Sequence, residues 1–450
     1  MENENKMGVM PIPRLIMAMS LPMIISMLVQ ALYNVVDSVF VARYSQDALA
    51  AVSYAFPAQN LMIGTATGTG VGMNALLSKS LGEKNFEKAN RTAGNGILLA
   101  GVGYMIFLLF GLFFAEKFIA FQTSTPSIIA EGKIYLQICT VLSFGIFGEI
   151  MYERLMQSTG KTIYTMFTQG IGAIVNIILD PIFIFGLLGC PKMGTAGAAL
   201  ATVIGQIAAF ILAVILNQKY NTELRIKASH FKPDRHIIGR IYAVGIPSIL
   251  MVGIGSITTT AMNKILNGFS DIAASVFGVY FKLQSFAFMP VFGLNNGVIP
   301  VIAYNYGARK RKRMLQAIGA ACIIASCFML VGLILMQVIP EPMLRLFDAG
   351  DEMMSIGIPA LRIISISFVF AGIAIALSSV FQALGRGLFS MLISFARQLV
   401  VLVPAAYLLS LTGNVNMVWW AYPIAEIMSI VVSLGLFAYL YKKVISEIPE

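Results

Sequence analysis

The second half of this chain repeats special residues of the first half at a constant offset of 225 positions. The recurring residues are prolines, glutamines and glycines, in the pairs Pro22 and Pro247, Gln59 and Gln284, Gly68 and Gly293, Gly72 and Gly297, Gly82 and Gly307, Gly132 and Gly357, Gln157 and Gln382, and Gly160 and Gly385. Glycine permits close helix contacts and proline sets bends. Their coincidence predicts two halves with similar backbone paths.

Composition places both halves in a membrane. Of the 450 residues, 58% are hydrophobic and only 12% are charged, whereas a soluble protein carries about 25% charged residues. Apolar stretches of about 20 residues or longer recur along the whole length, which is typical of a polytopic membrane protein. Two similar membrane halves with a cleft between them are a common plan of transporters.

The apolar stretches predict an all-α membrane protein with twelve transmembrane helices. We expect spans near residues 14–43, 50–78, 93–115, 134–157, 163–187, 195–217, 240–268, 272–304, 315–339, 354–382, 389–411 and 416–441. A polar segment separates the first six spans from the last six. The predicted domains are therefore an N-terminal lobe at 1–217, a cytoplasmic linker at 218–240 and a C-terminal lobe at 241–450.

The basic excess indicates topology. The formal net charge is +10, and most of the 31 Lys and Arg lie in alternate loops, as the positive-inside rule describes. The basic loops are Lys79 to Arg91, Lys219 to Arg240, Arg309 to Arg313 and the tail at Lys442 and Lys443. We therefore expect a multi-pass protein of the plasma membrane with both termini in the cytoplasm and no nucleic-acid partner.

Asp37 is the sharpest functional candidate, because an ionisable group inside a span costs several kcal/mol. It ends the string Tyr33-Asn34-Val35-Val36-Asp37, well inside the first span. Tyr33 and Asn34 precede Asp37 by four and three positions, so we expect the three side chains on one helix face. A carboxylate, an amide and a phenol together suit the binding of a proton or a small cation. The alternative is a structural polar network between helices.

A second polar group lies in the fifth span, where Asn176 and Asp180 are one turn apart and Pro181 disturbs the helix. Counting about 1.5 Å per residue, Asp37, Asp180 and Thr202 all fall in the outer half of the membrane. Two carboxylates at similar depth raise one another's proton affinity unless a cation lies between them. This is the electrostatic requirement for a coupling site. The alternative is that Asp180 faces polar headgroups near a kink.

Other charges inside spans have open interpretations. Glu149, Glu153 and Arg154 lie toward the cytoplasmic end of the fourth span, where an acid–base pair closing an inner gate and an interfacial ion pair are both consistent with the sequence. Lys282 lies within the eighth span and either tunes a cavity or extends its amine to the membrane surface.

Longer strings carry a resemblance over essentially the whole chain. They are Tyr33 to Asp37 followed by Phe40-Val41-Ala42-Arg43, Gly82-Glu83-Lys84, Gln157-Ser158-Thr159-Gly160-Lys161, Asn176 to Pro181, Gly197-Ala198-Ala199-Leu200-Ala201-Thr202, Pro290-Val291-Phe292-Gly293 and Asn305-Tyr306-Gly307-Ala308-Arg309. With these motifs the chain resembles the multidrug and toxic compound extrusion (MATE) family. The resemblance implies a V-shaped fold of two six-helix lobes related by a pseudo-twofold axis.

Within that family, the chain resembles the DinF-like branch with a cation site in the N-terminal lobe, since the seventh span contains no acid. The resemblance implies a cation-coupling set of side chains and one carbonyl, namely Asp37, Asn176, Asp180, the Ala198 carbonyl and the Thr202 hydroxyl. Sodium, if it is the ion, would bind at the four side chains. Pro22 is the implied hinge of the first helix. The expected cavity residues are Tyr33, Asn34, Tyr135, Gln137, Glu149, Glu153 and Lys282.

The implied function is secondary active efflux of organic, often cationic or amphipathic, compounds in exchange for H⁺ or Na⁺. We expect a monomer in the lipid bilayer with a small drug-like substrate, no enzymatic activity and no cofactor beyond the coupling ion. A lipid-linked precursor flippase of the same superfamily is the main alternative. A membrane-embedded enzyme or channel is a third, against which the sequence shows no catalytic triad, no HExxH string and no filter-like repeat.

Overall fold

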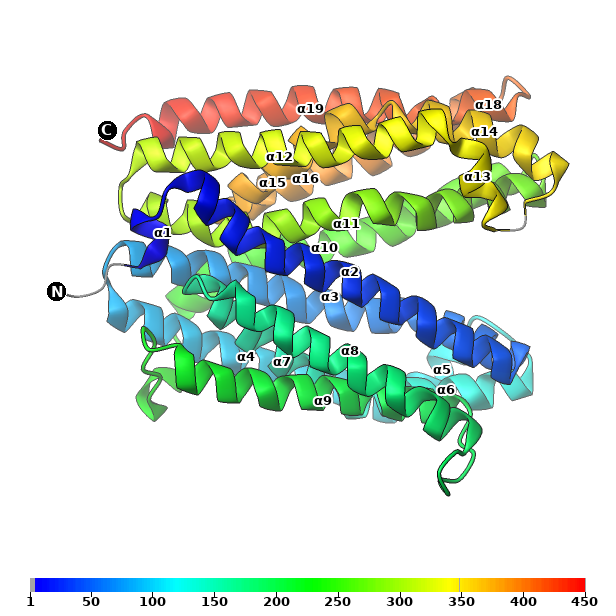
Figure 1. Cartoon of the computed structure of the whole chain (residues 1–450), viewed down its shortest axis with the longest axis horizontal. Coiled ribbons are helices and arrows are strands. Elements are labelled where there is room, and N and C mark those ends of the chain that lie inside the picture. Colours follow the sequence, from blue (N-terminus) through cyan, green and yellow to red (C-terminus); the bar gives the residue numbers. More distant parts are fainter. Residues whose placement is uncertain (1–4, 348, 450) are drawn as a thin grey trace. The chain divides into compact units, whose positions relative to one another are not determined.

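The computed structural model describes residues 5–347 and 349–449, and the regular secondary structure in this part is helical, with no strand (Figure 1). In that part, nine helices are long and apolar enough to cross a membrane, or up to eleven if two bent helix pairs each count as one span. The predicted polytopic all-α class is confirmed. The span expected at 50–78 corresponds to α3 (Gln46–Gly82), which has 37 residues but is rich in Gly, Ser and Thr and is not among the eleven.

The chain forms two compact units that divide two of its helices. One unit contains residue 5 and residues 25–249, and the other contains residues 6–24 and 250–449. The division therefore falls inside α2 (Ile12–Tyr44) and inside α10 (Arg235–Asn267). The units change at residue 25 in α2 and at residue 250 in α10, two positions that also differ by 225. Pro22 and Pro247 each lie three residues before this change.

The remaining helices each lie in one unit. The first unit also contains α3, α4 (Phe86–Phe113), α5 (Ala115–Ala120), α6 (Pro126–Val141), α7 (Phe144–Ser158), α8 (Thr162–Phe185), α9 (Thr195–Tyr220) and a short 3-10 helix (Ala228–Phe231). The second contains α1 (Lys6–Val9), α11 (Asp271–Gly307), α12 (Arg311–Val338), α13 (Pro340–Arg345), α14 (Asp351–Ser365), α15 (Phe368–Ala383), α16 (Gly387–Phe395), a π-helical turn (Ala396–Leu402), α17 (Val403–Ser410), α18 (Val415–Val418), α19 (Ala421–Leu440) and a π-helical end (Tyr441–Ile445).

The predicted repeat is confirmed by the helix bounds. The pairs α3 and α11, α4 and α12, and α5 and α13 begin and end at positions that differ by 225. The fourth and tenth spans, each predicted as one helix, are instead bent pairs, with 43° between α6 and α7 and 49° between α14 and α15. A serine lies at each break, where Ser143 Oγ donates to the Thr140 carbonyl at 2.7 Å and Ser367 Oγ to the Ile364 carbonyl at 2.6 Å. Such back-bonding competes with the regular helix ladder.

Two of the repeated glycines explain how α3 packs against the start of α10 in the first unit. A Cβ placed on Gly72 would lie 2.0 Å from the Ile241 carbonyl oxygen, and one on Gly68 would lie 2.8 Å from the Gly245 carbonyl oxygen. No side chain fits at those distances, so the backbones touch there because both residues lack Cβ.

The same contact recurs between α11 and the start of α2 in the second unit. A Cβ on Gly297 would lie 2.7 Å from Ser20 Cα, and one on Gly293 would lie 2.7 Å from Ile24 Cα. Ser20 Oγ also donates to the Leu294 carbonyl at 3.3 Å. The repeat thus reproduces a backbone contact and not only a helix order.

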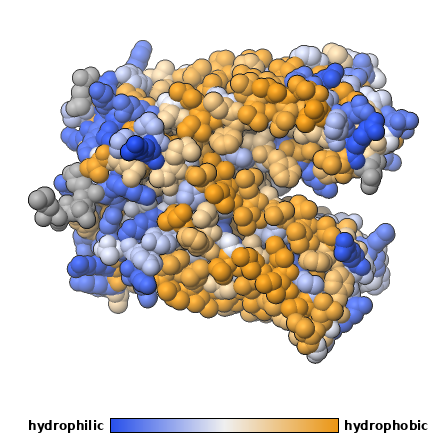
Figure 2. All heavy atoms as spheres, in the orientation of Figure 1, coloured by the Kyte–Doolittle hydropathy of each residue, from blue (hydrophilic) through white to orange (hydrophobic). Residues whose placement is uncertain are grey.

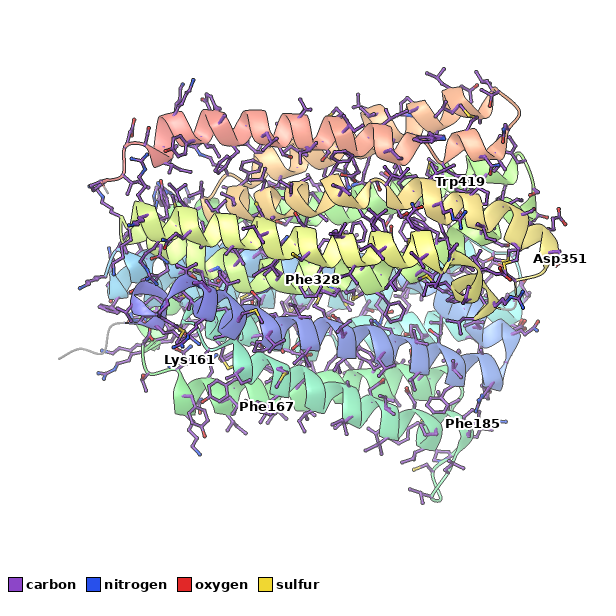
Figure 3. The ribbon with its side chains drawn as sticks, turned by 45° about the horizontal axis from the view of Figure 1, so that its top comes forward. Lys161, Phe167, Phe185, Phe328, Asp351 and Trp419 are labelled. Carbon is purple, nitrogen blue, oxygen red and sulfur yellow. The ribbon has the colours of Figure 1, made fainter. Side chains whose placement is uncertain are left out.

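Apolar side chains cover the outer faces of the helices, as a lipid environment requires. Along α4 the exposed residues include Val102, Met105, Ile106 and Leu109, between 46% and 58% exposed. In each unit the visible face is hydrophobic over the middle of the helices and hydrophilic toward their ends (Figure 2). Phe167 projects from α8 with 53% of its surface exposed (Figure 3).

The segment between α9 and α10 is fixed to α4 by polar contacts. Asn95 donates to the Lys232 carbonyl at 3.2 Å and accepts from the Asp234 N–H at 2.9 Å, and Arg91 forms an ion pair with Asp234 at 2.8 Å. The Asp234 carboxylate also caps α10 by accepting from the N–H of His236 at 2.9 Å. The predicted linker 218–240 is therefore docked on the first unit.

The glycine contact in the first unit generates a stability prediction. Gly72→Ala places a methyl group against the Ile241 carbonyl, and we expect it to destabilise the protein by about 1–3 kcal/mol because a backbone contact cannot yield as a side chain does. The measurement is the thermal midpoint in detergent. Gly101→Ala is the matched control, because a methyl there would meet no atom within 4 Å. Equal midpoints for both variants would contradict the contact.

The cap of α10 generates a pH prediction. The backbone N–H of Ile237, that of His236 and the nearby Arg91 guanidinium hold the pKa of Asp234 below its ordinary value. A depressed pKa contributes stability that is present above the unfolded value of about 3.9 and is lost as the pH falls below it. We expect Asp234→Ala to lower the thermal midpoint at pH 7 and to lose this effect toward pH 3. A deficit that stays constant with pH would argue against the carboxylate as its cause.

Candidate cation site in the first unit

Asp37 lies on the part of α2 that belongs to the first unit. Its side chain is half-buried, and its Oδ1 atom is buried without a hydrogen-bond partner among the described residues. The Asp37 and Asp180 carboxyl groups interact electrostatically with one another. Neither group has a donor when ionised, so a direct hydrogen bond between them would require a proton on one of them.

Asn176 and Asp180 share the buried face of α8, as their spacing predicts. Asp180 is fully buried and Asn176 is 2% exposed. Asn176 Nδ2 donates to Asp180 Oδ1 at 3.4 Å and to Thr202 Oγ1, on α9, at 3.3 Å. The amide therefore connects the carboxyl group of one helix to the hydroxyl group of the next.

Glycines set the close approach of α8 and α9 that makes these contacts. A Cβ on Gly205 would lie 2.6 Å from the Gly172 carbonyl oxygen, and a Cβ on Gly197 would lie 2.6 Å from the Phe183 carbonyl oxygen. The two α9 glycines flank Thr202, so they hold this hydroxyl against the polar face of α8. Larger residues at either position would separate the helices and the site.

Three oxygen atoms of this cluster are buried with no donor in the described structure. They are Asp37 Oδ1, Asn176 Oδ1 and Asp180 Oδ2. Buried polar atoms are almost always paired, and an unpaired buried acceptor costs about 1–3 kcal/mol or more. Acceptor oxygens without donors are suited to a proton or a small hard cation. Among the described residues, no group of three or more His, Cys, Asp or Glu could hold a metal ion.

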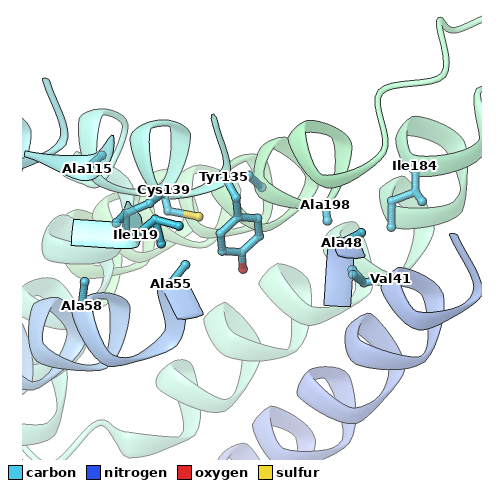
Figure 4. Close-up of a cluster of buried hydrophobic side chains, with 12 residues drawn as sticks. Val41, Ala48, Ala55, Ala58, Ala115, Ile119, Tyr135, Cys139, Ile184 and Ala198 are labelled. Atoms are coloured by element: carbon cyan, nitrogen blue, oxygen red, sulfur yellow. The ribbon is translucent and has the colours of Figure 1, made fainter. Parts of the chain in front are cut away.

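Tyr33 and Tyr135 border the cluster. Electrostatic interactions connect Tyr33 with Asp37 and Asp180, and Tyr135 with Asp37. Tyr135 is 2% exposed and projects from α6 into a set of small side chains that includes Ala48 and Ala55 of α3 (Figure 4). Apolar side chains of α3 and α6 therefore border the site on one side.

The other predicted residues are distributed as follows. Ala198 is fully buried in the first turn of α9. Asn34 is exposed, Gln137 is half-buried, and Pro22 is buried on the part of α2 that belongs to the second unit. Lys282 is exposed in the second unit, with its Nζ atom 5.7 Å from the centre of the Phe347 ring.

Glu149 and Glu153 are both buried on α7, at 8% and 3% exposure. The sequence reasoning did not identify the partners of Glu153, which accepts from Thr168 Oγ1 at 2.5 Å and from Gln169 Nε2 at 2.9 Å, both on α8. The spacing of Thr165, Thr168, Asn176 and Asp180 on one face of α8 carried that signal. Arg397 and Glu426, two charged residues near span ends, form an ion pair within the second unit.

Comparisons with known proteins agree with this architecture. The MatE family model matches residues 22–182 and 247–408, one range in each half of the repeat. The multidrug export protein MepA of Staphylococcus aureus (strain MRSA252) is 26% identical over 434 residues, covering 96% of this chain and 94% of that protein. MepA of Staphylococcus haemolyticus (strain JCSC1435) is 26% identical over 411 residues, covering 91% and 90%.

A solved structure shows the fold. The outward-facing structure of a multidrug resistance MATE family transporter of the MOP superfamily has a TM-score of 0.91 and 24% identity to this chain, covering 98% of this chain and 99% of that one. The fold is therefore that of the MATE transporters. Since the family model covers most of both halves, the chain belongs to the MatE family.

Proposed function

We propose that this chain is a multidrug exporter that exchanges organic, often cationic or amphipathic, compounds for H⁺ or Na⁺ at Asp37 and Asp180. The family and the similarity to MepA, a multidrug export protein, support the transport activity. The donor-free oxygens of Asp37, Asn176 and Asp180 support the ion coupling and carry this part of the proposal. The N-terminal-lobe cation site and the DinF-like branch, which the resemblance implies, are part of this proposal.

The coupling follows from electrostatics in a medium without water. Asp37 and Asp180 both ionised would repel one another, and a bound proton or sodium ion removes this repulsion. When the cation leaves, the net negative charge attracts a cationic substrate in its place. Binding of the next cation then displaces the substrate, so that one negative site serves two cations in turn.

Thr202, Asn176 and the Ala198 carbonyl are the proposed neutral ligands. The hydroxyl of Thr202 and the amide of Asn176 contact one another at 3.3 Å. A sodium ion would take the free oxygens of this group together with the carboxylates. Pro22 remains the proposed hinge of α2, and the two lobes, their linker, the cytoplasmic termini and the monomeric state remain predictions.

The comparisons favour the exporter over the flippase, since the similar proteins named above are multidrug export proteins. A lipid-transport assay in liposomes is the direct discrimination. The family consists of transporters, which also removes the membrane-enzyme alternative.

Asp37→Asn tests the coupling. We expect this variant to lose dye efflux driven by an ion gradient, because an amide cannot bind a proton and cannot neutralise a cation. The measurement is ethidium efflux from proteoliposomes at fixed membrane potential, with a pH gradient and a sodium gradient imposed separately. The gradient to which the wild-type protein responds identifies the ion.

Asp271→Asn is the matched control for this experiment, because Asp271 is an exposed aspartate at the start of α11 in the second unit. It should leave efflux unchanged. Full gradient-driven efflux by Asp37→Asn would remove Asp37 from the mechanism.

Thr202→Val tests the neutral ligands. Valine keeps the shape of threonine but removes the hydroxyl that Asn176 contacts, and loss of one buried hydrogen-bond partner costs about 1–3 kcal/mol. We expect an apparent affinity for the coupling ion about tenfold lower, with the maximal efflux rate less affected. Thr258→Val is the control, a buried threonine of the second unit whose hydroxyl bonds only its own helix, to the Ile254 carbonyl. Equal ion affinities in both variants would contradict the role of Thr202.

A further inference from the structure

Glu149 and Glu153 form a second pair of buried carboxyl groups in the first unit, on a different helix from Asp37 and Asp180. They are one turn apart on α7, so their side chains share a helix face. The two groups interact electrostatically. Neither belongs to the proposed cation site, whose atoms come from α2, α8 and α9.

The two glutamates have very different surroundings. Glu153 accepts hydrogen bonds from Thr168 and Gln169, and the positive charge of Arg154 acts on it. Glu149 is 8% exposed, and its carboxyl group forms no hydrogen bond or ion pair in the described structure. Its electrostatic neighbours are Glu153 and Tyr33.

The donors decide which of the two carries charge. A carboxylate is stabilised by donors and by a nearby cation, both of which Glu153 has. A buried carboxylate without donors, one turn from another carboxylate, pays both desolvation and repulsion. A proton on Glu149 removes both costs.

Other charged groups do not change this balance. The helices α3, α4, α8 and α9 pack against α7. Their basic side chains include Lys79, Arg91, Lys161 and Lys219, and none of these four acts on the pair in the described structure. Lys161 lies at the start of α8, at the opposite end from Phe185 (Figure 3). Arg154, whose guanidinium donates to Gln157 at 2.9 Å, is the one cation that acts on the pair.

Tyr33 connects this pair to the cation site. Its phenol interacts with Glu149 as well as with Asp37 and Asp180. Along α8, Thr168 and Asp180 are twelve residues apart, or about 18 Å. The two acid pairs are therefore separate sites on one polar face, with Tyr33 interacting with both.

We propose that Glu149, supported by ionised Glu153, is a second proton-binding site of this transporter. The inference deepens the proposed function and rests on it for a role in transport. Binding of the proton itself does not depend on Asp37. Release of this proton leaves two adjacent carboxylates, and these attract a cationic substrate by the same electrostatics.

Infrared difference spectroscopy of the wild-type protein in lipid, recorded over a pH titration, tests the site directly. We expect a carbonyl band of a protonated carboxyl group that disappears in Glu149→Gln and persists in Asp37→Asn. The exposed Glu352→Gln is the control and should leave the band unchanged. If the band component that persists in Asp37→Asn also survives in Glu149→Gln, the proposal is overturned.

Glu153→Gln provides a readout that a purely structural role would not give. It removes the negative charge one turn away, so the proton affinity of Glu149 should fall about tenfold or more, and the band should titrate at a lower pH. An unchanged titration would overturn the role of Glu153.

If Glu149→Gln does not fold, labelling of the wild-type protein by a hydrophobic carbodiimide, which reacts with protonated buried carboxyl groups, replaces it. We expect the label on Glu149, with less labelling as the pH rises. Absence of label on Glu149 overturns the proposal. Asp37→Asn distinguishes failure of this inference from failure of the proposed function, because loss of the cation site would leave the Glu149 band and label unchanged.

Discussion

Two adjacent buried carboxyl groups repel one another when both are charged, unless a cation lies between them. The helices of the first unit bring two such groups together. Asp37 comes from α2 and Asp180 from α8, and Asn176 and Thr202 complete the polar group. Gly197 and Gly205 let α9 approach α8 closely enough to place the Thr202 hydroxyl. Three oxygens of this group have no donor in the described structure, and under the proposed function a cation would satisfy them.

The repeat copies the scaffold but not this chemistry. At the equivalent positions of the second half, Asp37 is replaced by Met262, Asn176 by Val401 and Asp180 by Ala405. Glu149 is replaced there by Ala374. The helix bounds nevertheless agree. Backbone contacts made by glycine therefore recur in both units, whereas the carboxyl groups of the proposed cation site occur in the first unit alone.

The sequence predicted the repeat, the helical class and the shared face of Asn176 and Asp180, because glycine positions and helical spacing act locally. It did not predict the broken spans. Serine is common in unbroken helices, and only the structure shows that these two hydroxyl groups donate to carbonyl groups of the preceding turn. The exposure of Asn34, three residues before Asp37 on α2, was not predicted either. Partners across helices, such as Gln169 for Glu153, depend on helix rotation, which spacing alone does not fix. The functional assignment of the site residues remains a prediction.

The division of α2 and α10 between the two units has a consequence for biosynthesis. The first unit is closed by the start of α10, and the second contains the start of α2, which is made before α3 to α10. The first unit is therefore incomplete until residue 249 has been synthesised. Residues 6–24 lack their packing partners until α11 is in the membrane, since Ser20 and Ile24 pack against its glycines. Neither half is an independent folding unit, and the protein reaches its native packing only after insertion of both.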